Sequence, residues 1–308
     1  MIPLYTKQTA LRSFDVNFQT FDDPREIFDR QSGLPDFDAS ELSASEFLVR
    51  LSNGDRTFTA IPAFPSRMFR HGFICINNQM IHKPSDLEGK KIGVQLYTMT
   101  AAVWIRSILR DEYGVDLSGV EWVQGGIEHP GTHGTPRDMS QLPATIIMNN
   151  TSKSLDQLLV EGGISAIIGA DLPPSLGVVP YVSRLFPDYK EREKTFFIKH
   201  GIFPIMHLVV IRREIAIKHP KLAKELYNAL CDSKDTALIC MRASNPLQYM
   251  LPWLHDAVQE TENILGNDPW PYGVESNRHT LEVLISSLYK DGMINRLIPV
   301  DEMFSSVI

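Results

Sequence analysis

Strand-like and helix-like segments alternate along most of this chain, and the alternation restricts the fold more than any other feature. The central part of the pattern consists of short β-type runs and intervening helical periods, expected over residues 90–95, 101–113, 120–124, 145–148, 155–160 and 164–169. Strands that alternate with helices are typical of βαβ units, whose sheets are largely parallel. The sequence therefore predicts an α/β protein.

The flanking regions continue the same pattern. Strands are expected over 56–64, 73–77 and 207–213, and amphipathic helices over 220–242 and 281–288. The stretch 125–141 interrupts this alternation of strands and helices, because it is polar and rich in Gly and Pro. We expect it to be a long loop, and long loops in compact α/β proteins often carry function.

Composition narrows the classes of partner. The 308 residues include 30 Lys+Arg and 37 Asp+Glu, which gives a formal net charge of −7. An acidic chain is poorly suited to nucleic acid or to an anionic membrane, although one site can still be locally basic. The length allows one large domain or two moderate ones. Assembly into a homo-oligomer is compatible with these features.

Motifs for cofactors and metals are missing from the sequence. Neither GxGxxG nor GxxxxGK[ST] occurs, and the three cysteines, Cys75, Cys231 and Cys240, form no CxxC pair. His129 and His133 have a spacing that suits a helical metal site, but Pro130 and Gly131 between them oppose a helix. We therefore expect no cofactor and no metal.

The N-terminal sequence has no secretory character. Residues 1–8 are followed by charged side chains rather than by an apolar segment, and no run of 18 apolar residues occurs anywhere. We expect no membrane span and a cytoplasmic location.

Several segments together resemble one family. Leu87–Val94 is similar to the start of the second lobe in type II periplasmic-type solute-binding proteins. More specific are Asp38–Ser43, Phe64–His71, Tyr97–Trp104 and Gly201–His207, which resemble the 4,5-dihydroxyphthalate decarboxylase family. The resemblance extends over nearly the whole chain.

The resemblance implies a two-lobed type II periplasmic-binding-protein-like fold, with a central cleft and two crossover strands. We place the crossovers near Ile76–His82 and Pro204–Val210. Lobe one then comprises residues 1–80 and 206–308, and lobe two comprises 81–205. The ligand is expected in the cleft, where strand ends and helix N-termini of both lobes meet.

The resemblance also implies cofactor-independent decarboxylation of a hydroxylated aromatic acid, 4,5-dihydroxyphthalate to 3,4-dihydroxybenzoate. The partner would be a small anionic aromatic substrate. The alternative is a non-enzymatic solute-binding protein that delivers a small organic anion to a transporter. The lack of an export signal and the histidines near the expected cleft favour the enzyme.

Candidate binding residues are those able to hold a carboxylate. Arg67 and Arg70 could form bidentate contacts, and the alternative is a surface pair or a bond to a backbone carbonyl. The remaining candidates lie at expected helix starts, where hydroxyls either cap the helix or join its free amides in binding an anion: Ser43, Thr98 and Thr100, with Tyr97 as a hydrogen-bond donor, a stacking ring or a packed side chain.

Candidate catalytic residues are proton donors and acceptors. His207, His71 and His129 are the candidates for protonating the ring carbon, because histidine titrates near neutral pH. Asp171, after an expected strand, is the candidate acceptor for a hydroxyl proton. The alternatives are hydrogen bonding between lobes for His207, packing for His71, and turn formation for Asp171.

Overall fold

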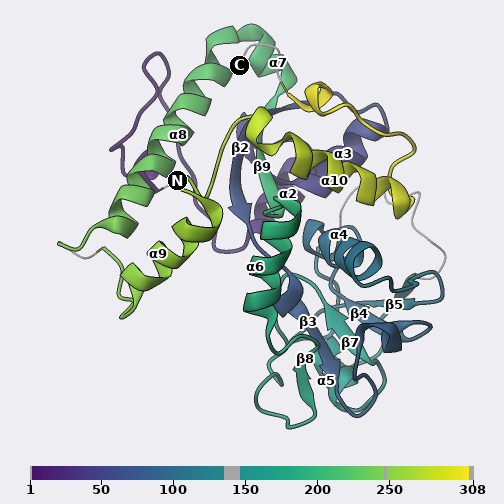
Figure 1. The fold of residues 1–308 in the computed structure, drawn as a ribbon. Helices are drawn as coiled ribbons and strands as arrows, with labels where there is room; N and C mark the ends of the chain where they lie inside the picture. The colour runs from purple at the N-terminus through teal and green to yellow at the C-terminus, as the bar shows by residue number, and fades with distance from the viewer. Residues whose placement is uncertain (1, 135–145, 246–247, 305–308) are drawn as a thin grey trace.

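The chain folds into two α/β units, each built on its own sheet (Figure 1). The computed structural model describes residues 2–134, 146–245 and 248–304. The strands expected from the sequence are present within one to three residues of their expected ends, because alternating or continuous apolar runs specify them locally.

The first sheet has three strands in the order β1 (Ala39–Ser43), β9 (Ile205–Arg212) and β2 (Phe58–Arg67). Both pairings are antiparallel. The prediction of largely parallel sheets is wrong for this sheet. The reason is that β9 returns from the other unit and inserts between β1 and β2, which themselves run in the same direction.

The second sheet has six strands in the order β6 (Ile146–Met148), β5 (Glu121–Gln124), β4 (Lys91–Val94), β7 (Ala166–Ile168), β3 (Ile74–Asn77) and β8 (Val182–Arg184). The pairings from β6 to β7 are parallel, as predicted. Strand β3 runs antiparallel to both of its neighbours, β7 and β8.

The chain passes between the sheets twice, first between β2 and β3 and again before β9. The expected first crossover near Ile76–His82 lies too far along the chain, because β3 already pairs with β7 and β8. A lobe boundary after residue 80 would likewise separate β3 from its own sheet. The return falls at Gly201–Pro204, after helix α6 (Tyr189–His200).

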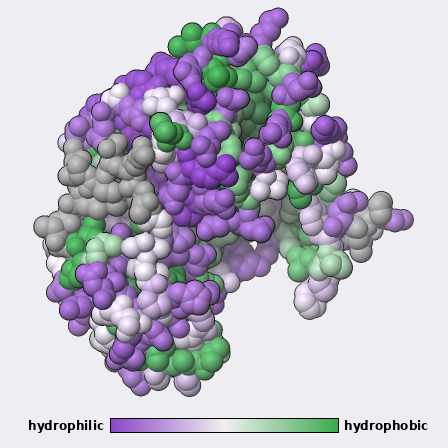
Figure 2. Space-filling model, turned by 180° about the vertical axis from the view of Figure 1, so that it is seen from behind, coloured by the Kyte–Doolittle hydropathy of each residue, from purple (hydrophilic) through white to green (hydrophobic). Residues whose placement is uncertain are grey.

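Helices cover both sheets and form an arm. Those not yet named are α1 (Ile2–Tyr5), α2 (Pro24–Ser32), α3 (Ala44–Ser52), α4 (Thr100–Ser107, continued by a π-helical turn at Ile108–Glu112), α5 (Leu155–Val160), α7 (Arg213–Lys218), α8 (Pro220–Arg242), α9 (Leu254–Leu265) and α10 (Arg278–Lys290). Helices α8 and α9 form the arm (Figure 1). From behind, the arm projects beside a surface on which polar and hydrophobic residues mix (Figure 2).

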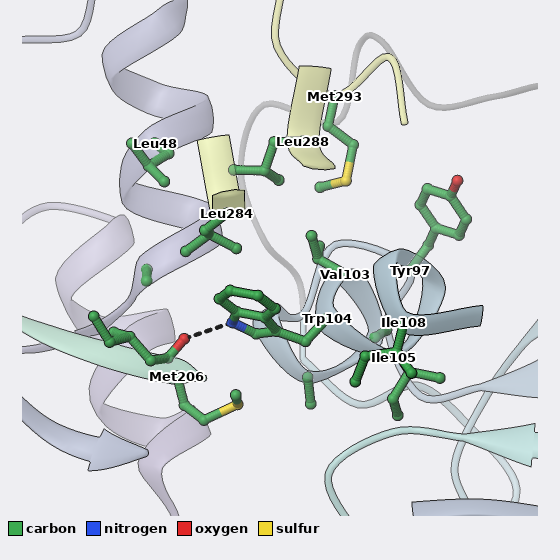
Figure 3. Close-up of a cluster of buried hydrophobic side chains, with 14 of the residues drawn as sticks. Leu48, Tyr97, Val103, Trp104, Ile105, Ile108, Met206, Leu284, Leu288 and Met293 are labelled. Carbon is green, nitrogen blue, oxygen red and sulfur yellow. Dashed lines mark hydrogen bonds between the residues drawn. The ribbon is translucent and has the colours of Figure 1, made fainter. Parts of the chain in front are cut away.

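Helix α4 joins the two units through a buried core. Trp104 lies at its centre, with Leu48 of α3, Leu284 of α10 and Met206 of β9 around it (Figure 3). The indole Nε1–H of Trp104 donates to the carbonyl of Ile205 over 2.8 Å. Truncating a buried tryptophan typically costs about 3–5 kcal/mol. The units are therefore held together by core packing as well as by the chain crossings.

Within the described residues, no helix combines the length and the hydrophobicity required to cross a membrane.

Candidate active site

Two helix N-termini from different units meet at a cluster of buried hydroxyls. Ser43 directly precedes α3, and Thr100 is the first residue of α4. Ser43 Oγ lies 2.9 Å from Thr100 Oγ1, and Ser45 Oγ lies 3.0 Å from the same atom. The first turn of a helix leaves amides unpaired and carries a partial positive charge. The junction could therefore attract an anion, and the prediction that Ser43 and Thr100 bind one remains a prediction.

Capping at this junction differs from the expectation. Ser43 forms no side-chain cap bond, and Met99, rather than Thr98 or Thr100, is the cap residue of α4. Thr98 contributes its carbonyl, which accepts from Ser45 Oγ over 2.6 Å, while its own hydroxyl oxygen is buried and has no hydrogen-bond partner among the residues that the structure describes.

Tyr97 is packed away from the hydroxyl cluster. Its ring lies beneath the Arg106 guanidinium, with Cζ 3.8 Å from the ring centroid, and its carbonyl accepts from Arg106 Nη1. Burial raises the pKa of the Tyr97 hydroxyl. These contacts favour the packing alternative for this residue.

Arg70 is a buried cation with few contacts. It lies between the units, where Nε contacts the Met206 sulfur at 3.3 Å and Nη1 donates to the carbonyl of Ala170 at 3.4 Å. Burial lowers the pKa of Arg70 to about 10, against the opposing charges of Asp171 and Glu193. Among the described residues, no carboxylate forms an ion pair with Arg70. Its guanidinium is therefore suited to an anionic ligand.

Arg67 is equally buried but occupied by protein groups. Its Nη1 donates to the carbonyl of Phe203 over 3.1 Å, and its Nη2 donates to the carbonyl of Pro271 over 2.8 Å and to Asn277. Burial lowers the pKa of Arg67 to about 10 as well. These contacts tie β2 to the segment before α10 and favour a structural role.

His207 forms a close pair with a glutamate. Its Nδ1 lies 2.5 Å from Glu41 Oε1, and the Phe28 ring packs edge-on at a centroid distance of 4.8 Å. His207 is also the strand partner of Ser43 in the β1–β9 pairing. The histidine is therefore placed beside the hydroxyl cluster.

His71 has a different environment. It is buried among the rings of Tyr113, Phe186 and Phe196, and its Nδ1 has no hydrogen-bond partner in the described part of the chain. Burial lowers the pKa of His71 to about 4, so its ring is neutral near pH 7. A neutral imidazole enclosed by aromatic rings suits packing better than proton donation.

Asp171 lies three residues after β7, close to its expected place. Its Oδ2 accepts from Gln95 Nε2 over 2.8 Å, and the same nitrogen lies 3.5 Å from His133 Nδ1. Asp171 is exposed, so its carboxylate can accept further hydrogen bonds. His129 is exposed in the loop and forms no hydrogen bond within the described residues.

The expected loop reaches across to the first unit. Its described part, residues 125–134, contains no helix or strand, and residues 135–141 lie outside the described residues. Gly134 has a φ of +79°, and a Cβ there would lie 2.6 Å from Arg25 Cδ. Arg25 in turn bonds Glu46 and lies over the Phe28 ring. The loop therefore approaches the neighbours of His207.

Glu41 and Gln95 are the polar residues that the sequence analysis missed at this junction. For Glu41 a signal exists, because residues two apart in a strand share a face, and Glu41 precedes Ser43 by two. For Gln95 the only signal is its position directly after β4, where parallel strands place functional side chains.

Comparison with known proteins decides the family. No protein-family profile matches the chain. A 4,5-dihydroxyphthalate decarboxylase from Comamonas testosteroni is 32% identical over 308 residues, covering 99% of this chain and 92% of that protein. The chain belongs to the 4,5-dihydroxyphthalate decarboxylase family. A second member, from Pseudomonas putida, is 37% identical over 190 residues, covering 60% of this chain and 72% of that protein.

A solved structure shares the fold of this decarboxylase family member. A crystal structure of a protein from Archaeoglobus fulgidus matches with a TM-score of 0.51 and 13% identity, covering 95% of this chain and 92% of that one. The ligand-binding component of an ABC-type import system from Staphylococcus aureus gives a TM-score of 0.49 and 11% identity, covering 97% and 88%. The expected two-lobed α/β fold is confirmed.

Proposed function

We propose that this chain decarboxylates 4,5-dihydroxyphthalate to 3,4-dihydroxybenzoate, with the substrate held at the junction of the two lobes. The observation that carries the proposal is the 32% identity to a named decarboxylase over 99% of the chain. A cytoplasmic location is part of the proposal, since the substrate would be an intermediate of aromatic catabolism.

Binding would use the cation and the helix N-termini. Arg70 is a buried guanidinium that has no carboxylate partner among the described residues and, unlike Arg67, makes only two long contacts with protein groups; planar guanidinium matches a carboxylate bidentately. The N-termini of α3 and α4, with Ser43 and Thr100, offer amides and hydroxyls to a second anionic group. A phthalate carries two adjacent carboxylates, and these two features would hold them.

The chemistry needs a proton at the carbon that loses its carboxylate. His207 is the proposed donor: its Nε2–H protonates that ring carbon while Asp171 accepts the proton of the para hydroxyl. The bond from the ring carbon to the carboxylate then breaks, its electron pair returns to the ring, and carbon dioxide leaves. Asp171 then returns its proton to the ring oxygen, and His207 takes one proton from solvent, which restores the starting state.

Neither His71 nor His129 has comparable support as the donor. His71 is enclosed by rings and His129 is exposed in the loop, whereas His207 lies opposite Ser43 in the strand pairing. We therefore rank His207 first.

The test is release of carbon dioxide by the purified protein. 4,5-Dihydroxyphthalate should yield equimolar carbon dioxide and 3,4-dihydroxybenzoate, and phthalate without hydroxyls should bind without reacting. Tight binding of both acids with no carbon dioxide from either would overturn the proposal and favour a solute-binding protein.

A further inference from the structure

We infer that Glu41 is a positioning residue for His207, holding the imidazole so that only Nε2 faces the substrate. The inference rests on the proposed function, because it assigns a role within the same site. It also concerns a residue that no sequence motif marked as functional.

Strand geometry places the two side chains together. Ser43 pairs with His207 and Glu41 pairs with Val209 in the antiparallel β1–β9 ladder. Residues two apart share a face, so Glu41 and His207 are diagonal neighbours on one face. The contact between Nδ1 and Oε1 is 2.5 Å, and the two side chains are 20% and 15% exposed for His207 and Glu41 respectively. The pair is thus mostly shielded from water.

The contact determines which nitrogen is available. An ionised carboxylate only accepts hydrogen bonds, so His207 Nδ1 must carry a hydrogen in this pair. The Phe28 ring, at an interplanar angle of 80°, limits rotation of the imidazole. Nε2 is then the nitrogen that gives its proton to the ring carbon, and the Glu41 carboxylate stabilises the imidazolium before transfer.

The other charged groups near the His207–Glu41 pair either have ion-pair partners of their own or lie farther from His207. Arg25 of α2 forms ion pairs with Asp29 and Glu46. Its guanidinium lies over the Phe28 ring and not over the His207 ring. Tyr272 lies in the segment before α10. Burial raises the pKa of its hydroxyl, and the nearby Glu41 charge adds to this effect. Among the described residues, Glu41 is the one carboxylate that bonds His207, so it is the group that selects which ring nitrogen carries the hydrogen.

The chain offers a matched control pair. His200 of α6 and Glu112 of the π-helical turn after α4 form a similar pair, with Nε2 of the histidine 2.7 Å from Oε2 of the glutamate. Both side chains are partly buried. Glu112→Gln removes a histidine–carboxylate contact of the same kind outside the proposed site. It should leave kcat and KM unchanged.

The experiment compares Glu41→Gln and Glu41→Leu with wild type and with Glu112→Gln. We expect kcat to fall roughly 10- to 100-fold in Glu41→Leu and less in Glu41→Gln, with KM within a few-fold, because only proton donation is impaired. Thermal unfolding checks that each variant is folded. A Glu41→Leu variant that is folded and retains wild-type kcat overturns the inference.

A second readout does not depend on turnover. Nitrogen-15 NMR of the histidine rings should show the neutral form of the His207 ring, which is left after proton transfer and is assigned by its loss in His207→Gln, as the Nδ1–H tautomer in wild type and as a mixture of tautomers in Glu41→Leu. An Nε2–H tautomer in wild type, or no change in Glu41→Leu, contradicts the inference even if the protein is active. Absence of decarboxylation in wild type with the expected tautomers would instead refute the proposed function alone.

Discussion

Arg106 of α4 donates through Nε to Asp291 Oδ2 over 2.8 Å, and this ion pair joins the two lobes inside the protein. The side chains are 1% and 4% exposed, and Arg110 Nη1 reaches the other oxygen of the same carboxylate at 2.6 Å. Asp291 follows α10, so one carboxylate fixes α4 of the second lobe against the first. The core around Trp104 lies on the same helix.

Replacing Asp291 should therefore destabilise the protein strongly. Asp291→Asn leaves a buried guanidinium without its counter-charge, and breaking one partner of a buried pair typically costs about 3–5 kcal/mol. Urea unfolding gives the free energy directly. Glu161→Gln, which removes the exposed pair with Lys153, is the control and should cost roughly 0–1 kcal/mol. Equal losses in the two variants would mean that the lobes do not depend on the Asp291 contact.

The same contacts predict little movement between the lobes on binding. Because α4 already packs against α3 and α10, we expect solution X-ray scattering to give the same radius of gyration with and without saturating phthalate. A clear decrease would show hinge closure of the kind expected for a carrier.

The two neighbouring arginines should behave differently. Arg70→Met should weaken phthalate binding by about 1.5–3 kcal/mol, the cost of losing a charged hydrogen bond, and should leave binding of the dimethyl ester nearly unchanged. Arg67→Met should instead lower the unfolding free energy, because Arg67 bonds Phe203, Pro271 and Asn277. Calorimetric binding and urea unfolding of both variants separate the roles. Equal loss of acid and ester binding in Arg70→Met would make that residue structural.

His71 should make stability depend on pH. Burial lowers the pKa of His71 to about 4, whereas in the unfolded chain the pKa is about 6.5. Between these values the unfolded state binds a proton that the folded state does not, so stability is complete above pH 6.5 and falls as the pH drops towards 4. The loss should reach about 3 kcal/mol. His71→Phe, which suits the surrounding rings, should flatten this part of the pH–stability curve; an unchanged slope would show that His71 is accessible to protons in the folded state.

The elements could be predicted because their signals are local. The apolar run before Arg212 and the alternation around Ile92 specify strands whatever the rest of the chain does. The antiparallel first sheet was not predictable in this way. Its order depends on β9, which is separated from β1 by the whole second lobe.

The sequence predicted that helix starts of the two lobes converge, but it did not predict the contacts that each candidate residue makes. Ser43 and Thr100 are 57 residues apart and meet because two helix starts converge, which the family resemblance implied. Nothing in the local sequence separates Arg67 from Arg70, since the bonds that occupy Arg67 come from residues more than 130 positions away. The buried state of His71 likewise depends on rings from α6 and its flanking turns.

Single-turnover decarboxylation by His207→Gln tests the account most directly. We expect phthalate affinity within a few-fold of wild type and a rate of carbon dioxide release lower by roughly 10²–10⁴, the usual contribution of a general acid. His71→Gln and His129→Gln serve as comparisons and should release carbon dioxide within a few-fold of wild type once folding is confirmed. A folded His207→Gln variant that releases carbon dioxide from 4,5-dihydroxyphthalate at the wild-type rate would contradict the account.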